Sequence, residues 1–339
     1  MAATSAGRVL RHSHDGEPGI LRQRAGRGFR YVDARGKTVR APATLERIKR
    51  LAIPPAYTQV WICAQANGHL QACGRDARGR KQYRYHPDWV RTRSDNKFDR
   101  IVAFGKALPS LRRRVRSDLA LPGLPREKVL AIVIAVMGRT LARIGNDAYA
   151  RDNHSYGLTT LRNRHLERAG QGKARLRFRG KSGQAQAMVI DDRQLSALVR
   201  RCQQLPGQLL FQYRDDDGKV RPVSSSDVND YLRNATGADF SAKDFRTWGG
   251  TLVALRELAQ LPVPETGGER ALSASQNQVI AAVAAMLGNT PAVCRKAYID
   301  PSVFDGWRDG KLSAMQALRG PRQWEAAALR FLRAAHRAG

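Results

Sequence analysis

Residues 126–146 read REKVLAIVIAVMGRTLARIGN, and this stretch decides the fold of the larger part of the chain. Its apolar side chains recur mainly at spacings of three and four residues, the period of one face of an α-helix. The members of this face are Leu130, Val133, Ile134, Met137, Leu141 and Ile144. We therefore predict a buried helix that ends at Gly145, since glycine commonly terminates helices.

Most of the chain beyond this helix also reads as helical. Helical patterns recur over residues 191–205, 224–237, 243–258, 273–289, 290–299 and 322–339. Thr290 is a natural N-cap, Pro291 suits the first turn that follows it, and Tyr298 is expected about two turns down that helix. The last stretch is predicted to be a capping helix.

Two regions are predicted to contain strands. Residues 174–190 alternate around a Gly-Lys-Ser-Gly turn, which predicts a β-hairpin with Lys181 at its tip. Residues 29–89 read as short strands with one short helix, and Asn67-Gly68 is a hairpin turn sequence. The fold class expected is α+β. It comprises a flexible arm over 1–27, a small β-rich domain over 28–93, and a mainly helical domain with a short antiparallel hairpin over 94–339.

The charge of the chain indicates a polyanionic partner. The sequence holds 59 Lys and Arg against 29 Asp and Glu, a formal net charge of +30. Basic residues are spread through segments that read as folded, and 42% of residues are apolar, which excludes a disordered polycation. Nucleic acid is therefore the expected partner, and purely solubilising charge is the weaker alternative.

Metal, membrane and export signals are not recognised in the sequence. The four cysteines, Cys63, Cys73, Cys202 and Cys294, form no Cys-x-x-Cys pair and read as reduced thiols. The histidines His86, His154 and His165 have no metal-like spacing. No run of about 18 apolar residues and no secretory signal occurs, so we expect a cytoplasmic, nucleoid-associated protein.

Five residues of the helical part can act together on a phosphodiester. They are Arg143, Lys181, Arg246, Asn289 and Tyr298. A phenol with a pKa of about 10 becomes a nucleophile only where cations favour its phenolate. Two arginines can bind the non-bridging oxygens, a lysine can protonate the leaving oxygen, and an amide before a helix N-terminus can donate to phosphate. Such a set needs no metal or ATP. Singly, each residue is more often a solvated or packed side chain.

The sequence segments around these five residues, together with one segment of the N-terminal part, resemble those of a known family. The segments RGKSG, KDFRTWGG, LGNTPAVCRKAY, DAYARDNHSYGLTTLRNRH and GRDARGRKQYRYHPDW look like signatures of type IB DNA topoisomerases of the poxvirus and bacterial branch. The resemblance runs from about residue 31 to 307. It implies that Tyr298 joins the DNA 3′-phosphate, that Arg143 and Arg246 bind the phosphate, and that Lys181 is the general acid.

Three positions differ from family or superfamily patterns. Asn289 stands where the family often has histidine, and this neutral amide cannot donate a catalytic proton. Asn146 stands where the family has a lysine. Lys243 stands where the related tyrosine recombinases usually carry histidine, which favours a topoisomerase.

The basic and aromatic segment in the N-terminal part is expected to contact DNA. A basic strand can lie in a groove, with Gln reading base edges and Tyr meeting the backbone. The alternative is a solvated edge strand whose charges block pairing. The candidates are Arg80, Lys81, Gln82, Tyr83 and Tyr85, with Tyr149 and Lys243 from the helical part.

The expected function is relaxation of supercoiled double-stranded DNA by a monomer that clamps the duplex, without any cofactor. Two alternatives remain open at this point. A tyrosine recombinase would use the same chemistry to exchange strands at defined sites. A non-enzymatic basic DNA-binding protein would keep the fold and lack the reaction.

Overall fold

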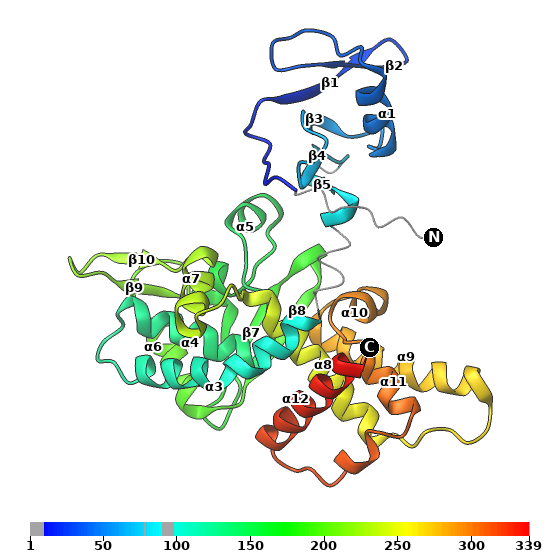
Figure 1. Cartoon of the computed structure of the whole chain (residues 1–339). Helices are drawn as coiled ribbons and strands as arrows, with labels where there is room; N and C mark the ends of the chain where they lie inside the picture. Colours follow the sequence, from blue (N-terminus) through cyan, green and yellow to red (C-terminus); the bar gives the residue numbers. More distant parts are fainter. Residues whose placement is uncertain (1–9, 78, 80, 90–97, 339) are drawn as a thin grey trace. The chain divides into compact units, whose positions relative to one another are not determined.

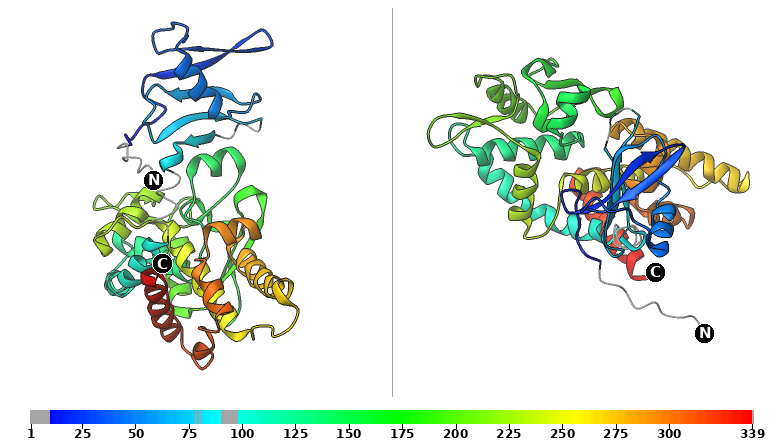
Figure 2. Two further views of the ribbon diagram at one scale, coloured as in Figure 1. Left: turned by 45° about the vertical axis from the view of Figure 1, so that its right-hand side comes forward. Right: turned by 90° about the horizontal axis from the view of Figure 1, so that it is seen from above.

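The computed structural model of the chain describes residues 10–77, 79, 81–89 and 98–338. It divides into two compact units, Met1–Lys97 and Phe98–Gly339, which are shown in Figures 1 and 2 and described separately below. The boundary predicted at residue 93 lies outside the described residues.

The first unit is an antiparallel five-stranded sheet in the order β2-β1-β3-β4-β5. Its strands are β1 Gly19–Ala25, β2 Gly28–Val32, β3 Thr58–Cys63, β4 Leu70–Arg75 and β5 Lys81–Tyr85. Helix α1, Pro42–Arg50, packs its buried Ile48 against Ile20, Val60 and Ile62 of the sheet. The predicted hairpin at Asn67-Gly68 is present as β3 and β4.

The flexible arm predicted over residues 1–27 is wrong for its second half. Strand β1 pairs with both β2 and β3, so it lies inside the sheet. This strand has no recognisable strand pattern in the sequence, because only Gly19 and Ile20 are buried and the other side chains are exposed or partly exposed. Residues 1–9 of the predicted arm lie outside the described part.

The second unit is mainly helical. Its helices are α3 Asp99–Leu119, α4 Arg126–Thr140, α5 Asp147–Asn153, α6 Arg193–Gln203, α7 Ser225–Thr236, α8 Ala242–Gln260, α9 Gly268–Leu287, α10 Pro291–Ala297, α11 Ser302–Arg308 and α12 Pro321–Ala338. Helix α4 lies at the centre, in contact with α3, α6, α7 and α8, and ten of its residues are buried. The α+β class is thereby confirmed, and the predicted C-terminal helix is α12.

Two small sheets complete this unit. The strands of the first are β6 Leu166–Arg168, β7 Ala174–Arg179 and β8 Ala185–Ile190, in the order β6-β7-β8, and those of the second are β9 Gln212–Arg214 and β10 Val220–Pro222. Strands β7 and β8 are the predicted hairpin, and a short 3₁₀ turn, Lys181–Gly183, carries Lys181 at its tip.

Helix α4 ends one turn earlier than its apolar period predicts. Thr140 is its last residue, and Leu141 adopts a left-handed backbone with φ of +53°. The Leu141 side chain packs on Gly249 of α8, where a Cβ atom would lie 2.4 Å from Leu141 Cδ1. This contact holds the bend in place. Arg143 consequently lies in the irregular segment after the helix rather than on it.

Candidate active site

Arg246 is fixed by the ends of two helices. It lies on α8 with 4% of its surface exposed. Its Nη1 donates to the carbonyl of Leu141 at 2.5 Å and its Nη2 to that of Leu287 at 2.8 Å. These carbonyls end α4 and α9, where the helix dipoles are negative. Its Nε is buried and has no hydrogen-bond partner among the described residues.

The backbone around Arg143 is clamped by the segment 157–159. The amides of Leu158 and Thr159 donate to the carbonyls of Arg143 and Ile144 at 2.9 and 2.7 Å. Gly157 is required for this approach, because a Cβ there would lie 2.5 Å from the Gly145 nitrogen. The segment DAYARDNHSYGLTTL, residues 147–161, therefore turns back so that its last part hydrogen-bonds the backbone of Arg143 and Ile144.

The Arg143 side chain meets the same helix end as Arg246. Its Nη2 donates to the Gly288 carbonyl at 2.9 Å and to the Asn289 amide oxygen, and its Nη1 approaches the Leu287 carbonyl at 3.4 Å. Burial lowers the pKa of Arg143, and the neighbouring Arg246 charge lowers it further. The C-terminus of α9 therefore holds two guanidinium groups beside each other.

Tyr298 lies next to this pair. Thr290 caps α10 as predicted, accepting from the Val293 amide, but Tyr298 is the C-cap residue of that helix and not within it. Its ring lies under Arg246, with the guanidinium carbon 5.0 Å from the ring centroid. Its carbonyl accepts from Thr251 at 3.3 Å and approaches Gly250 so closely that a Cβ there would lie 2.6 Å away.

The site contains a second buried donor besides Arg246 Nε. The Asn289 amide oxygen is engaged by Arg143, while its Nδ2 has no oxygen or nitrogen acceptor in the described part of the chain. The Cys294 thiol, a weak acceptor, lies beside Asn289. Buried donors without acceptors are uncommon and costly, so this pair marks a place suited to an anion.

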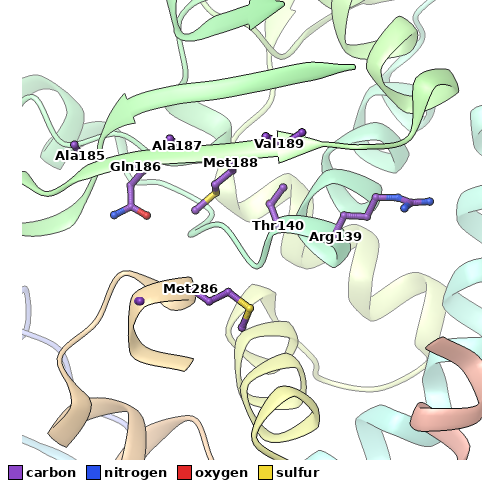
Figure 3. Close-up of a pocket in the computed structure, with 9 residues that line it drawn as sticks. Arg139, Thr140, Ala185, Gln186, Ala187, Met188, Val189 and Met286 are labelled. Carbon is purple, nitrogen blue, oxygen red and sulfur yellow. The ribbon is translucent and has the colours of Figure 1, made fainter. Parts of the chain in front are cut away.

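Lys181 is exposed at its hairpin tip, and no described side chain bonds it. The hairpin is nevertheless connected to the site through Gln186. A Cβ on Gly288 would lie 2.7 Å from Gln186 Nε2, and one on Gly180 would lie 2.8 Å from its Cγ. Figure 3 shows Gln186 and Met188 pointing from β8 toward the segment that carries Met286. They line a cavity of about 400 Å³ there. Sequence reasoning missed Gln186, because its contact with Gly288 joins residues 102 positions apart and leaves no local pattern.

The N-terminal candidates lie on the edge strand β5. Tyr83 and Tyr85 are 45% and 42% exposed, with ring centroids 6.1 Å apart. Lys81 Nζ pairs with Asp15 at 2.5 Å, and Gln82 donates to Asp76 at 2.9 Å. The fifth candidate predicted in this part of the sequence, Arg80, lies outside the described residues.

The remaining candidates lie around the second unit. Tyr149 is 48% exposed on α5, and Lys243 is exposed in the first turn of α8. Asn146, which stands in place of the family lysine, caps α5 by accepting from the Tyr149 amide at 3.1 Å.

The cysteines and histidines show no metal site in the described structure. All four cysteines are free and buried. His165 is buried with its ring near Tyr156 and Phe178. Within the described ranges, no three His, Cys, Asp or Glu residues could share a metal ion, and no helix could span a membrane.

Comparisons with known proteins assign both units to the same kind of protein. Residues 86–315 match the family described as eukaryotic DNA topoisomerase I, catalytic core, and residues 28–76 match the bacterial DNA topoisomerase IB N-terminal domain. The DNA topoisomerase 1B of Acanthamoeba polyphaga mimivirus is 32% identical over 83% of this chain and 85% of its own length.

Two poxvirus proteins are more distant relatives. DNA topoisomerase 1B of vaccinia virus (strain Copenhagen) is 21% identical, and DNA topoisomerase I of monkeypox virus is 22% identical. Each match covers 75% of this chain and 76% of the relative. The chain therefore belongs to the type IB DNA topoisomerases, in the branch that contains the poxvirus and bacterial enzymes.

Proposed function

We propose that this isomerase relaxes supercoiled duplex DNA through a transient break in one strand. The Tyr298 oxygen attacks the phosphorus, a 3′-phosphotyrosyl bond forms, and the bond to the 5′ oxygen breaks. The freed strand rotates, and the 5′ hydroxyl then reverses the attack. No ATP or metal is needed, because the phosphotyrosyl ester conserves the energy of the broken bond.

The observation that supports this mechanism best is a pair of buried donors near Tyr298 that have no oxygen or nitrogen acceptor in the described chain. Arg246 Nε and Asn289 Nδ2 are buried without an oxygen or nitrogen acceptor in the described chain, next to two guanidinium groups. A phosphate has acceptor oxygens to satisfy both and a negative charge to balance the arginines. We assign Arg143, Arg246 and Asn289 to binding the scissile phosphate and to stabilising charge that develops on it.

Lys181 is assigned as the acid that protonates the leaving 5′ oxygen. An alkoxide is a poor leaving group, so proton donation is worth about 10²–10⁴ in rate. The position of Lys181 is consistent with this role, because it is exposed at a hairpin tip whose Gln186 contacts Gly288, the residue before Asn289. The proposal therefore requires DNA to lie against this tip.

A plasmid assay tests the proposed reaction. Negatively supercoiled plasmid is incubated with the protein in EDTA without ATP, and the products are separated by electrophoresis after denaturant trapping. Relaxation with a trapped covalent adduct is expected from the wild type. A mobility shift without relaxation or adduct would contradict the mechanism, and exchange between defined sites would indicate recombination instead.

Binding is proposed to involve both units of a monomer that clamps the duplex. Tyr83, Tyr85, Gln82 and the basic residues near them would contact one stretch of DNA, and Tyr149 and Lys243 would contact another. The net charge of +30 supports association with nucleoid DNA in the cytoplasm. The affinity should fall steeply with salt, in proportion to the number of phosphates contacted.

A further inference from the structure

A buried carboxylate lies two residues after Tyr298. Asp300 is 1% exposed. Its Oδ1 accepts from the amide and the hydroxyl of Ser302 at 3.0 and 2.7 Å. Its Oδ2 lies 2.9 Å from Nε2 of His336, which comes from α12. A carboxylate only accepts, so this histidine nitrogen carries the proton. A buried carboxylate held by three donors has one defined position.

The same aspartate is connected to the Tyr298 backbone. The Asp300 amide donates to Thr251 Oγ1 at 3.1 Å, and that hydroxyl donates to the Tyr298 carbonyl at 3.3 Å. Thr251 is fully buried on α8, one residue after Gly250. The segment from Tyr298 to Ser302 is thus bonded to α8 on one side and to α12 on the other.

Helix α12 is itself held firmly, so it can serve as an anchor. Gly306 of α11 accommodates Phe331, since a Cβ there would lie 2.3 Å from the Phe331 ring. Glu325 accepts two bonds from Arg112 of α3 at 2.7 and 2.6 Å. Figure 1 shows α12 beside α11 and α8, and contacts between these helices agree with the view. This helix follows the matched catalytic core, which ends at residue 315.

We propose that His336 is a positioning residue for the nucleophile. Through Asp300 it fixes the segment that follows Tyr298, and so it makes α12 part of the catalytic apparatus. His336 itself does not contact the substrate. The inference rests on the proposed role of Tyr298, and it adds a dependence of cleavage on a helix outside the matched core.

The test compares His336→Ala and His336→Gln with wild type in single-turnover cleavage of a DNA substrate at saturating enzyme. We expect cleavage on the order of tenfold slower for His336→Ala, because a small displacement of a reacting group is costly. DNA affinity should stay within about twofold, since no DNA contact is removed. The Gln amide can donate to Asp300, so His336→Gln should recover at least half of the wild-type rate.

Two controls separate this positioning role from proton donation and from a general disturbance of α12. Arg333→Ala alters the exposed side of α12 and should cleave at the wild-type rate. A 5′-bridging phosphorothiolate, whose leaving group needs no acid, should fail to rescue His336→Ala. Rescue would mean that His336 supplies a proton, which overturns the proposal. Wild-type cleavage by His336→Ala, or a His336→Gln rate as low as that of Ala, would also overturn it.

The experiments distinguish a failure of the proposed function from a failure of the positioning role of His336. If wild-type protein forms no covalent adduct at all, the role of Tyr298 is refuted first. If wild type cleaves and His336→Ala cleaves equally fast, only the positioning role is refuted. Thermal unfolding of each variant establishes that the compared proteins are folded. Should His336→Ala not fold, His336→Phe takes its place, since this ring fills the site but cannot donate to Asp300. Cleavage about tenfold slower than that of Arg333→Ala supports the proposal, and a rate within about twofold of that control overturns it.

Discussion

The two units differ in how deeply some of their candidate residues are buried. In the helical unit Arg246 is buried and both of its terminal nitrogens are bonded to main-chain carbonyls. In the sheet unit Tyr83 and Tyr85 project from an edge strand and are nearly half exposed. A group that acts on a reacting phosphorus needs a fixed position, whereas a group that contacts a groove needs exposure.

The difference also separates stability from function. Removing a buried arginine leaves carbonyls unsatisfied, so its loss should affect folding and chemistry together. Removing an exposed tyrosine from β5 should affect DNA binding alone. Substitutions in each unit therefore test whether stability and activity are lost together or separately.

Tyr298→Phe should abolish the covalent adduct and plasmid relaxation, because the oxygen proposed as the nucleophile is removed. The ring still packs under Arg246, so folding and DNA affinity should stay near wild type. Denaturant trapping on labelled DNA measures the adduct, and a mobility shift measures binding. A wild-type adduct level in this variant would take the nucleophile role away from Tyr298.

Arg246→Ala should lower cleavage by about 10²-fold or more, the typical loss when a donor to developing charge is removed. It should also destabilise the protein by about 2 kcal/mol, because the Leu141 carbonyl loses its side-chain donor and the Leu287 carbonyl keeps only the longer bond from Arg143. Urea unfolding and single-turnover cleavage measure the two losses. A variant that is as stable as wild type would contradict the structural role.

Lys181→Ala should lower the cleavage rate without lowering the stability of the protein. Cleavage is expected to fall by about 10²–10⁴-fold with no change in the unfolding midpoint, since this lysine is exposed and no described side chain bonds it. A 5′-bridging phosphorothiolate should restore the cleavage rate. Lack of rescue would show that Lys181 does not act as the acid.

Much of this arrangement was predictable from local patterns in the sequence. The capped helix at Thr290, the hairpin that carries Lys181 and the central apolar helix each follow from turn chemistry or period, and the structure confirms them. Their signals come from neighbouring residues, so one sequence is enough. The roles of the site residues came from the resemblance and stay proposals.

The rest depends on distant contacts. The apolar face of α4 continues to Ile144, yet packing of Leu141 on Gly249 ends the helix at Thr140. The pairing of Asp300 with His336 joins residues 36 positions apart and leaves no periodic signal. Strand β1 is mostly exposed, so neither hydrophobic alternation nor composition identifies it. In each case tertiary packing overrides the local pattern.

Tyr83→Ala combined with Tyr85→Ala should weaken DNA binding by about tenfold, roughly 1.4 kcal/mol, if the two rings contact DNA. Cleavage at saturating DNA should stay within about twofold of wild type, because the catalytic unit is unaltered. Binding titrations and single-turnover rates measure the two quantities. A large loss of saturated cleavage would contradict the separation of the units.

Asp15→Asn should give the smallest effect and shows how far the sheet unit depends on an exposed ion pair. The hydrogen bond from Lys81 lowers the pKa of Asp15, so its stabilising contribution is present above the unfolded pKa and is lost as pH falls through the folded value. Exposed pairs of this kind contribute about 0.5 kcal/mol. The variant should therefore be slightly less stable at pH 7. Its free energy of unfolding should also fall less between pH 7 and pH 3 than that of wild type, because the contribution of Asp15 is already absent.

The same variant releases Lys81. If Lys81 then contacts phosphate, the salt dependence of DNA binding should steepen by about 0.9 in log–log slope. Urea unfolding at pH 7 and pH 3 and binding titrations in increasing salt measure these changes, and a stability loss above about 2 kcal/mol would mean that Asp15 organises the sheet rather than one side chain.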